Sequence, residues 1–180
     1  MSVTNTVYIL HGRDSSPQGK KIKAMAAIGR DCGWKVIAPD YSKIKDPDQR
    51  VARFLETQER PAGKVILAGS SMGSYVAIEA SKTFKPDALF LLAPAIYIEG
   101  YDEFDPQPVA DHITLIHGWD DKLIAPACAV RFADKHKTDL HLLNDGHELY
   151  NSIDFIEKTF RSTLMAHSKS TRLESLVPVI

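Results

Sequence analysis

The chain has 180 residues, with 22 basic and 23 acidic side chains, a hydrophobic fraction of 44% and a formal net charge of −1. At about 150 residues per domain, this length predicts a single domain, and the ordinary apolar content argues against a disordered chain. The near-neutral charge offers no basic surface for nucleic acid or for an acidic membrane. We therefore expect no nucleic-acid partner.

The cysteine content and the N-terminal sequence argue against several further classes of protein, namely disulfide-rich, zinc-binding, secreted and membrane-spanning ones. The two cysteines, Cys32 and Cys128, are too few for a disulfide framework or a four-thiolate zinc site, and there is no H-E-x-x-H motif, so we expect neither a metal nor a cofactor. Residues 1–6 lack the basic start and apolar run of a signal peptide, and no apolar stretch approaches the ~20 residues needed to cross a bilayer. We expect a cytoplasmic protein without membrane insertion.

Short, continuously apolar segments alternate along the chain with amphipathic helical patterns. Runs of this kind predict strands buried on both faces, and they lie at residues 7–10, 36–38, 65–68, 88–92, 113–116 and 140–143. In the first helical pattern Ile22, Met25 and Ile28 share one face, and we expect Ser16 to cap this helix with Pro17 in its first position. Further helices are expected from 46 or 47 to before 61, then at 73–84, 126–136 and 152–167.

This alternation predicts an α/β fold in three layers, with a minimal six-stranded, mostly parallel sheet and helices on both faces. We expect one domain over residues 1–167. Residues 168–180 do not continue the alternation of strands and helices, because they are polar at first and then apolar. They predict a C-terminal tail that either frays or docks its apolar end on a neighbour.

The third predicted strand leads into the sequence Gly69-Ser70-Ser71-Met72-Gly73 and then directly into a helical pattern. A G-x-S-x-G pattern between a strand and a helix is what a nucleophile elbow requires. The tight turn exposes one serine hydroxyl above the sheet, and the small residues two positions before and after it relieve backbone crowding. Ser71 is therefore the candidate nucleophile, and the alternative is a glycine-rich structural turn.

A serine hydroxyl needs a base, and the base needs a carboxylate to orient it. In this fold class the order along the chain is serine, acid and histidine, each after a later strand. His147 follows the sixth predicted strand and is the candidate base. Asp121 is the preferred acid because of the His-Gly-x-x-Asp spacing of residues 117–121, with Asp120 as the alternative. Asp145 is expected to form a turn.

The other six histidines lack such a context. His11 and His117 each precede a glycine at a strand end, where a structural hydrogen bond is the expected role. The remaining four have no motif around them, and we expect them at the surface or in packing: His112, His136, His141 and His167.

Acyl transfer also requires hydrogen-bond donors for the oxyanion that forms on the attacked carbonyl. The backbone N–H after the nucleophile, that of Met72, is the first candidate. The second should come from the loop that follows the first strand, within residues 10–17. Gly12 would let this loop pass close to the substrate, and the Arg13 N–H is the candidate second donor.

Only residues 94–112 separate the fourth and fifth predicted strands, which is too few for a cap domain over the site. This segment mixes aromatic and acidic side chains: Tyr97, Glu99, Tyr101, Asp102, Glu103, Phe104 and Asp105. One interpretation is an aromatic lip with an acidic rim that would disfavour anionic substrates. The other is a solvated loop anchored by its aromatic residues. We expect Gly12, Tyr97, Trp119 and Tyr150 to form the pocket walls.

Four motifs together resemble the α/β-hydrolase superfamily and, more narrowly, the small bacterial YqiA-type esterases. They are the strand-HG-x-x-SSP of residues 8–17, the GSS-x-G-x-Tyr of residues 69–75, the Asp121 loop and the Gly146-His147 pair. The resemblance covers about residues 5–165. It implies a lidless or nearly lidless serine hydrolase of short-chain esters, with Ser71, Asp121 and His147 as its triad. This chain is shorter than the narrower group, and residues 95–111 have no clear counterpart there.

The sequence therefore predicts hydrolysis of small carboxylic esters through an acyl-enzyme at a shallow, open site. Thioesters, amides or lactones are alternative substrates for the same residues. A hydrolase-fold module that binds a small molecule or a partner protein with little turnover is the alternative from another class, and a metal-dependent hydrolase is a third. The natural substrate and the oligomeric state stay open at this point.

Overall fold

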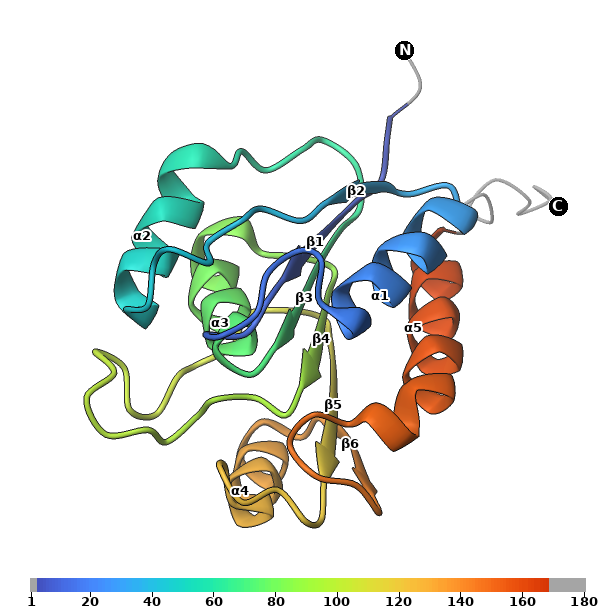
Figure 1. The fold of residues 1–180 in the computed structure, drawn as a ribbon. Coiled ribbons are helices and arrows are strands. Elements are labelled where there is room, and N and C mark those ends of the chain that lie inside the picture. The colour runs from blue at the N-terminus through green and yellow to red at the C-terminus, as the bar shows by residue number, and fades with distance from the viewer. Residues whose placement is uncertain (1–2, 169–180) are drawn as a thin grey trace, which may run out of the picture.

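Parallel pairing joins the six strands of the computed structural model, which describes residues 3–168 (Figure 1). The strand order is β2-β1-β3-β4-β5-β6, and each neighbouring pair is parallel. The strands are β1 (Thr6–Leu10), β2 (Lys35–Ile37), β3 (Val65–Ser70), β4 (Ala88–Leu92), β5 (His112–Gly118) and β6 (Asp139–Leu143). The predicted six-stranded sheet is confirmed, and within the described residues it is entirely rather than mostly parallel.

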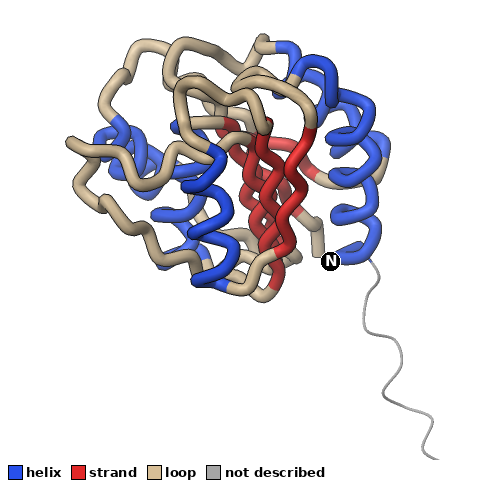
Figure 2. Tube along the Cα trace, turned by 90° about the horizontal axis from the view of Figure 1, so that it is seen from below, coloured by secondary structure: helices blue, strands red, loops and turns tan. Residues whose placement is uncertain are grey.

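Helices cover both faces of this sheet, which gives the three layers seen edge-on in Figure 2. One face carries α1 (Lys20–Asp31) and α5 (Ile153–Ser168). The opposite face carries α2 (Pro47–Thr57), α3 (Met72–Phe84) and α4 (Pro126–His136). A short 3₁₀ helix, η1 (Tyr150–Ser152), precedes α5. The predicted α/β fold is therefore confirmed.

Two apolar clusters, one on each face, hold the layers together. Alternate residues of β1 point to opposite sides, so that Val7 joins the cluster with α1 and α5 while Tyr8 joins the cluster with α2, α3 and α4. The central strands β1, β3 and β4 are buried along their whole length. Burial of each large apolar side chain stabilises the fold by about 1.5–3 kcal/mol. This explains the continuously apolar strand sequences.

The starts of the first two helices follow different rules. For α2, the Asp46 side chain accepts a hydrogen bond from the Gln49 N–H at 2.8 Å. The prediction that Ser16 caps α1 is wrong, because the Ser16 hydroxyl accepts from the Gln18 N–H at 3.2 Å and its carbonyl accepts from Gly19 at 3.0 Å. Those contacts form a turn, and α1 begins only at Lys20. The loop between β1 and α1 is correspondingly long.

The connection between β4 and β5, residues 93–111, contains neither helix nor strand, so there is no cap domain at this position. Asp48 of α2 holds the connection down. One oxygen of its carboxylate accepts from the Tyr75 hydroxyl at 2.6 Å, and the other accepts from the Asp102 N–H at 3.0 Å. The ring of Tyr101 packs edge-on against Tyr75, with centroids 4.7 Å apart. Aromatic residues therefore do anchor this segment.

At the C-terminal end, α5 continues through Ser168, whose hydroxyl accepts a hydrogen bond from the Trp34 indole at 2.7 Å. The rest of the predicted tail, residues 169–180, lies outside the described residues. Among residues 3–168, none of the helices is long and apolar enough to span a membrane.

Candidate active site

The three residues singled out for catalysis follow three different strands at the same edge of the sheet. Ser71 comes directly after β3, Asp121 follows β5, and His147 follows β6. Because parallel strands present their carboxyl ends at one edge, residues far apart in sequence meet there. The sheet therefore brings together side chains separated by up to 76 positions.

Ser71 occupies a strained turn between β3 and α3. Its φ of 55° and ψ of −121° lie in a region that residues other than glycine rarely adopt. The turn is tight enough that a side chain on Gly69 would collide with the Gly73 backbone, and one on Gly73 would collide with the Leu10 carbonyl. The two glycines are thus required sterically, as a nucleophile elbow demands.

A chain of hydrogen bonds links the hydroxyl of Ser71 to a buried carboxylate. The Oγ atom of Ser71 lies 3.0 Å from His147 Nε2, and His147 Nδ1 lies 2.7 Å from Asp121 Oδ2. An ionised carboxylate only accepts hydrogen bonds, so Nδ1 carries the proton and Nε2 is free to accept the serine proton. The side chain of Asp121 is fully buried and that of His147 is 12% exposed. This geometry can move a proton off the serine.

The carboxylate of Asp121 is held from its other side as well. Its Oδ1 atom accepts from the backbone N–H groups of Leu123 and Ile124, each at 2.9 Å. The Nε2 atom of His117 lies 3.2 Å from Oδ2 and donates to the Ile124 carbonyl at 3.0 Å. Burial lowers the pKa of the His117 imidazole, so the neutral form is favoured. These contacts fix the carboxylate that faces His147.

Asp120 and Asp145, the other two aspartates in the loops after β5 and β6, have different surroundings. Asp120 is exposed to solvent. Asp145 is buried, but it accepts hydrogen bonds from the Gly146 N–H at 2.8 Å and the Ser152 hydroxyl at 2.9 Å. Its contacts form the turn that leads into His147.

The loop after β1 lies against the elbow. A side-chain carbon built on Gly12 would sit 3.4 Å from the Ser71 Cβ, so the two backbones approach closely. Within residues 3–168, neither the Met72 amide nor the Arg13 amide donates a hydrogen bond to another backbone group. Both N–H groups are thus available to a bound oxyanion.

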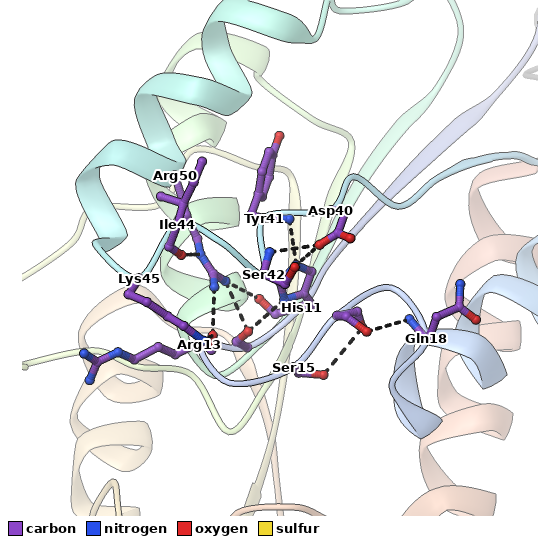
Figure 3. A network of polar contacts seen from close by, with 12 residues as sticks. His11, Arg13, Ser15, Gln18, Asp40, Tyr41, Ser42, Ile44, Lys45 and Arg50 are labelled. Atoms are coloured by element: carbon purple, nitrogen blue, oxygen red, sulfur yellow. Dashed lines mark hydrogen bonds and ion pairs between the residues drawn. The ribbon is translucent and has the colours of Figure 1, made fainter.

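Arg50 is the main residue at this edge that sequence reasoning missed. It is fully buried in α2, and its guanidinium donates to the backbone carbonyls of residues 11–13 (Figure 3). A sequence signal was present, since Arg50 precedes Phe54 by one helical turn and so shares its buried face. A lone arginine on an apolar helix face indicates a partner inside the fold.

A cavity of about 510 Å³ opens above Ser71. It is lined by Gly12, Arg13, Asp14, Ser15, Gly19, Lys20, Lys21, Ile22, Ser70, Ser71, Met72, Ala95, Ile98, Tyr101, Leu123, Ile124, His147, Glu148 and Tyr150. Of the expected walls, Gly12 and Tyr150 line it. Tyr97 and Trp119 do not: the Tyr97 ring packs under the Arg131 guanidinium at 4.0 Å, and Trp119 is 57% exposed.

The charges at the cavity differ from the expected acidic rim. None of the acidic residues of the 95–111 segment lines it, and one of them, Asp105, pairs with Lys135 of α4. The cationic residues Arg13, Lys20 and Lys21 line it instead, with Asp14 and Glu148. The acidic rim of this interpretation is therefore wrong, whereas one aromatic residue of the segment, Tyr101, does line the cavity. The segment's polar contacts run to α2, α3 and α4.

Lys21 is the most enclosed of these charged groups. Its side chain is only 9% exposed, and its ammonium lies 3.6 Å from the Glu148 carboxylate, which is itself 61% exposed. Burial lowers the pKa of Lys21, while the nearby Glu148 opposes that shift. In the described part of the chain, the cavity included, no group of three or more His, Cys, Asp or Glu side chains is arranged to hold a metal ion.

Comparison with known proteins agrees with this fold. Residues 5–131 match the model of an uncharacterised protein family, UPF0227. A Xanthomonas campestris protein assigned to the hydrolases of the α/β superfamily is 29% identical, with 91% of this chain and 99% of that one covered and a TM-score of 0.82. Est1E from Butyrivibrio proteoclasticus is 14% identical, with 92% of this chain and 89% of that one covered and a TM-score of 0.77. A serine hydrolase without a lid from Xanthomonas campestris is 18% identical, with 89% of this chain and 81% of that one covered and a TM-score of 0.64. No curated protein matches the chain.

Proposed function

Because the chain belongs to the uncharacterised protein family UPF0227, within the α/β-hydrolase superfamily, we propose that it is a serine hydrolase that cleaves small carboxylic esters. The observation that carries this proposal is the hydrogen-bonded series from Ser71 through His147 to Asp121. It stands at the floor of an open cavity with no cap domain above it. Such a series activates a hydroxyl for attack on a carbonyl.

In the first half of the reaction, the Ser71 oxygen forms a bond to the ester carbonyl carbon while its proton passes to His147 Nε2. The carbonyl electron pair moves onto the oxygen, which becomes an oxyanion. When this tetrahedral species collapses, the bond to the alcohol oxygen breaks, and the alcohol leaves with the proton from Nε2. The negative charge of Asp121 stabilises the transient imidazolium and keeps its ring oriented.

The second half repeats these steps with water. A water molecule gives its proton to His147 Nε2 and attacks the acyl-enzyme carbonyl, and the carboxylic acid is released as Ser71 regains its proton. In both halves the amides of Met72 and Arg13 donate to the oxyanion. Loss of one such donor typically slows the reaction by about 10²–10³-fold.

The cavity supports small esters as the substrate class. About 510 Å³ is near the lower part of the range for small-molecule sites, roughly 300–1,000 Å³. Apolar side chains of Ile98, Leu123 and Tyr150 share the lining with charged groups. A thioester or lactone of similar size would meet the same nucleophile, so a substrate series is part of the test.

Covalent labelling tests the proposal directly. A fluorophosphonate should label the folded wild-type protein, and peptide mapping should place the adduct on Ser71 rather than on Ser70. The Ser71→Ala variant should neither label nor hydrolyse p-nitrophenyl acetate above the uncatalysed rate. Equal hydrolysis by wild type and variant, or an unlabelled wild type, would contradict the proposal and favour a binding module of the same fold.

A further inference from the structure

The peptide unit between Gly12 and Arg13 connects the candidate oxyanion hole to the interior of the protein. In a trans peptide the C=O and the N–H point in opposite directions within one plane, and the described residues contain no cis peptide bond. Whatever fixes the Gly12 carbonyl therefore also fixes the direction of the Arg13 N–H. The groups that hold this carbonyl control the oxyanion donor.

The Arg50 guanidinium holds the Gly12 carbonyl together with the carbonyls on either side, and Figure 3 shows its bonds running to this loop. Its Nη1 atom donates to the carbonyls of His11 at 3.0 Å and Gly12 at 3.2 Å, and Nη2 donates to the Arg13 carbonyl at 3.0 Å. The Nε atom donates to the Ile44 carbonyl at 2.6 Å. The planar guanidinium thus reaches three consecutive carbonyls of one loop.

The same Gly12 oxygen receives a further strong donor. His11 Nδ1 lies 2.8 Å from it, and His11 Nε2 accepts from the Tyr41 N–H at 2.9 Å. Because Nε2 accepts, Nδ1 must carry the proton of the neutral ring and donate it to the Gly12 carbonyl. Burial lowers the pKa of His11, which favours this neutral form.

Arg50 does not serve as an ordinary structural ion pair. It is 0% exposed, yet the arginines that pair with carboxylates in the described part of the chain are Arg53 and Arg161. A buried cation without a carboxylate partner is costly, and here the guanidinium donates its hydrogen bonds to backbone carbonyls. Hydrogen bonds from a charged donor are also about twice as strong as neutral ones, and they polarise the peptide that accepts them.

We propose that Arg50 is a positioning residue of the oxyanion hole, which turns and polarises the Gly12–Arg13 peptide so that its N–H points at the carbonyl attacked by Ser71. This inference rests on the proposed serine hydrolase function and deepens it. The contribution arises only when the oxyanion forms. Replacing Arg50 should therefore lower kcat and leave KM nearly unchanged.

The test compares Arg50→Met and Arg50→Lys with Arg53→Met, a matched control three residues along α2 whose guanidinium is exposed and pairs with Glu56. Hydrolysis of p-nitrophenyl acetate is measured per active site, counted with a fluorophosphonate, so that unfolded molecules do not contribute. For Arg50→Met we expect kcat to fall about 10–100-fold, below the loss of a whole donor, with KM within about threefold. The kcat of Arg50→Lys should lie between those of the wild type and Arg50→Met, because one ammonium cannot span three carbonyls.

A second readout separates positioning from a general effect on folding. A boronic acid that forms a tetrahedral adduct with Ser71 should bind more weakly to Arg50→Lys, by about the factor lost in kcat/KM. If Arg50→Met does not fold, the kcat and the boronate affinity of Arg50→Lys provide the test. Unchanged kcat and unchanged boronate affinity in a folded Arg50 variant would overturn the inference. A wild-type protein that neither labels nor turns over would instead overturn the proposed function.

Discussion

The Nε2 atom of His117 lies 3.2 Å from Oδ2 of Asp121, and both side chains are completely buried. The same Nε2 also donates to the Ile124 carbonyl, so it carries the ring proton. The other ring nitrogen, Nδ1, is buried without a hydrogen-bond partner among the described residues. His117 therefore presents an N–H to the carboxylate that orients His147, and it does so as a neutral ring.

This burial predicts a specific dependence of stability on pH. Because the folded-state pKa of His117 is lowered, the unfolded chain takes up a proton near pH 6.5 while the folded chain does not. The free energy of unfolding should therefore fall as the pH drops below about 6.5, until the folded-state pKa is reached. In His117→Gln an amide N–H replaces the ring N–H, and this part of the pH dependence should disappear.

Thermal unfolding at pH 8, 7, 6 and 5 measures the effect. The melting temperature of the wild type should fall more steeply toward pH 5 than that of His117→Gln. His11 also has a pKa lowered by burial, but it is present in both proteins and cancels in the comparison. Parallel curves for the two proteins would show that His117 does not remain neutral in the folded state.

Replacing each candidate acid in turn tests the assignment of Asp121. In Asp121→Asn the amide can still accept from the backbone N–H groups of residues 123 and 124, but its NH₂ faces His147 Nδ1. That contact favours the wrong tautomer of the imidazole, and we expect kcat to fall about 10³–10⁴-fold with the fold retained. Asp120→Asn, at an exposed position, should keep kcat within about twofold. The opposite ranking would transfer the role to Asp120.

Much of this arrangement could be predicted because local rules and the fold agree. The strands are continuously apolar where the structure buries both faces, and the spacing of Gly69, Ser71 and Gly73 satisfies a steric requirement within one turn. The order of Ser71, Asp121 and His147 along the chain placed them at one edge of a parallel sheet. Their approach within hydrogen-bonding distance follows from that topology.

The remaining features depend on contacts that no local pattern specifies. Arg50 is separated by 37–39 residues from the carbonyls that it binds, so its partners appear only when α2 packs beside the β1 loop. Tyr97 turns away from the cavity because α4 offers Arg131 as a partner. The start of α1 was misplaced because Ser16 can cap either a helix or a local turn, and its neighbours select the turn.

The enclosed ammonium of Lys21 predicts which charge the cavity prefers on an ester. Its competing partner Glu148 is 61% exposed and 3.6 Å away, so a carboxylate on the substrate can approach the same ammonium. We expect Lys21→Met to raise KM roughly 10-fold for a p-nitrophenyl hemiester with a free carboxylate, because a hydrogen bond to a charged group contributes about 1.5–3 kcal/mol. The KM for neutral p-nitrophenyl acetate should stay within about threefold.

Lys23, which is exposed on α1, provides the control for this measurement. Lys23→Met should leave both KM values unchanged. Burial lowers the pKa of Lys21, so its ammonium should lose its proton at a lower pH than an ordinary lysine does. As the pH rises, the preference for the hemiester should therefore weaken earlier than it would with an ordinary lysine. Equal changes in KM for the charged and neutral esters would indicate lost packing rather than a lost charge.

The bond between Asp48 and Tyr75 predicts a coupling between α2 and the segment beside the cavity. The Tyr75 hydroxyl donates to Asp48 at 2.6 Å and accepts from the Glu103 N–H at 3.2 Å, while its ring packs against Tyr101, which lines the cavity. Asp48→Ala and Tyr75→Phe should each lower the free energy of unfolding by about 1–3 kcal/mol. Because both remove the same bond, the double variant should lose less than the sum, with a coupling of about 0.5–3 kcal/mol in urea denaturation. Strict additivity would show that the bond between Asp48 and Tyr75 contributes nothing to stability.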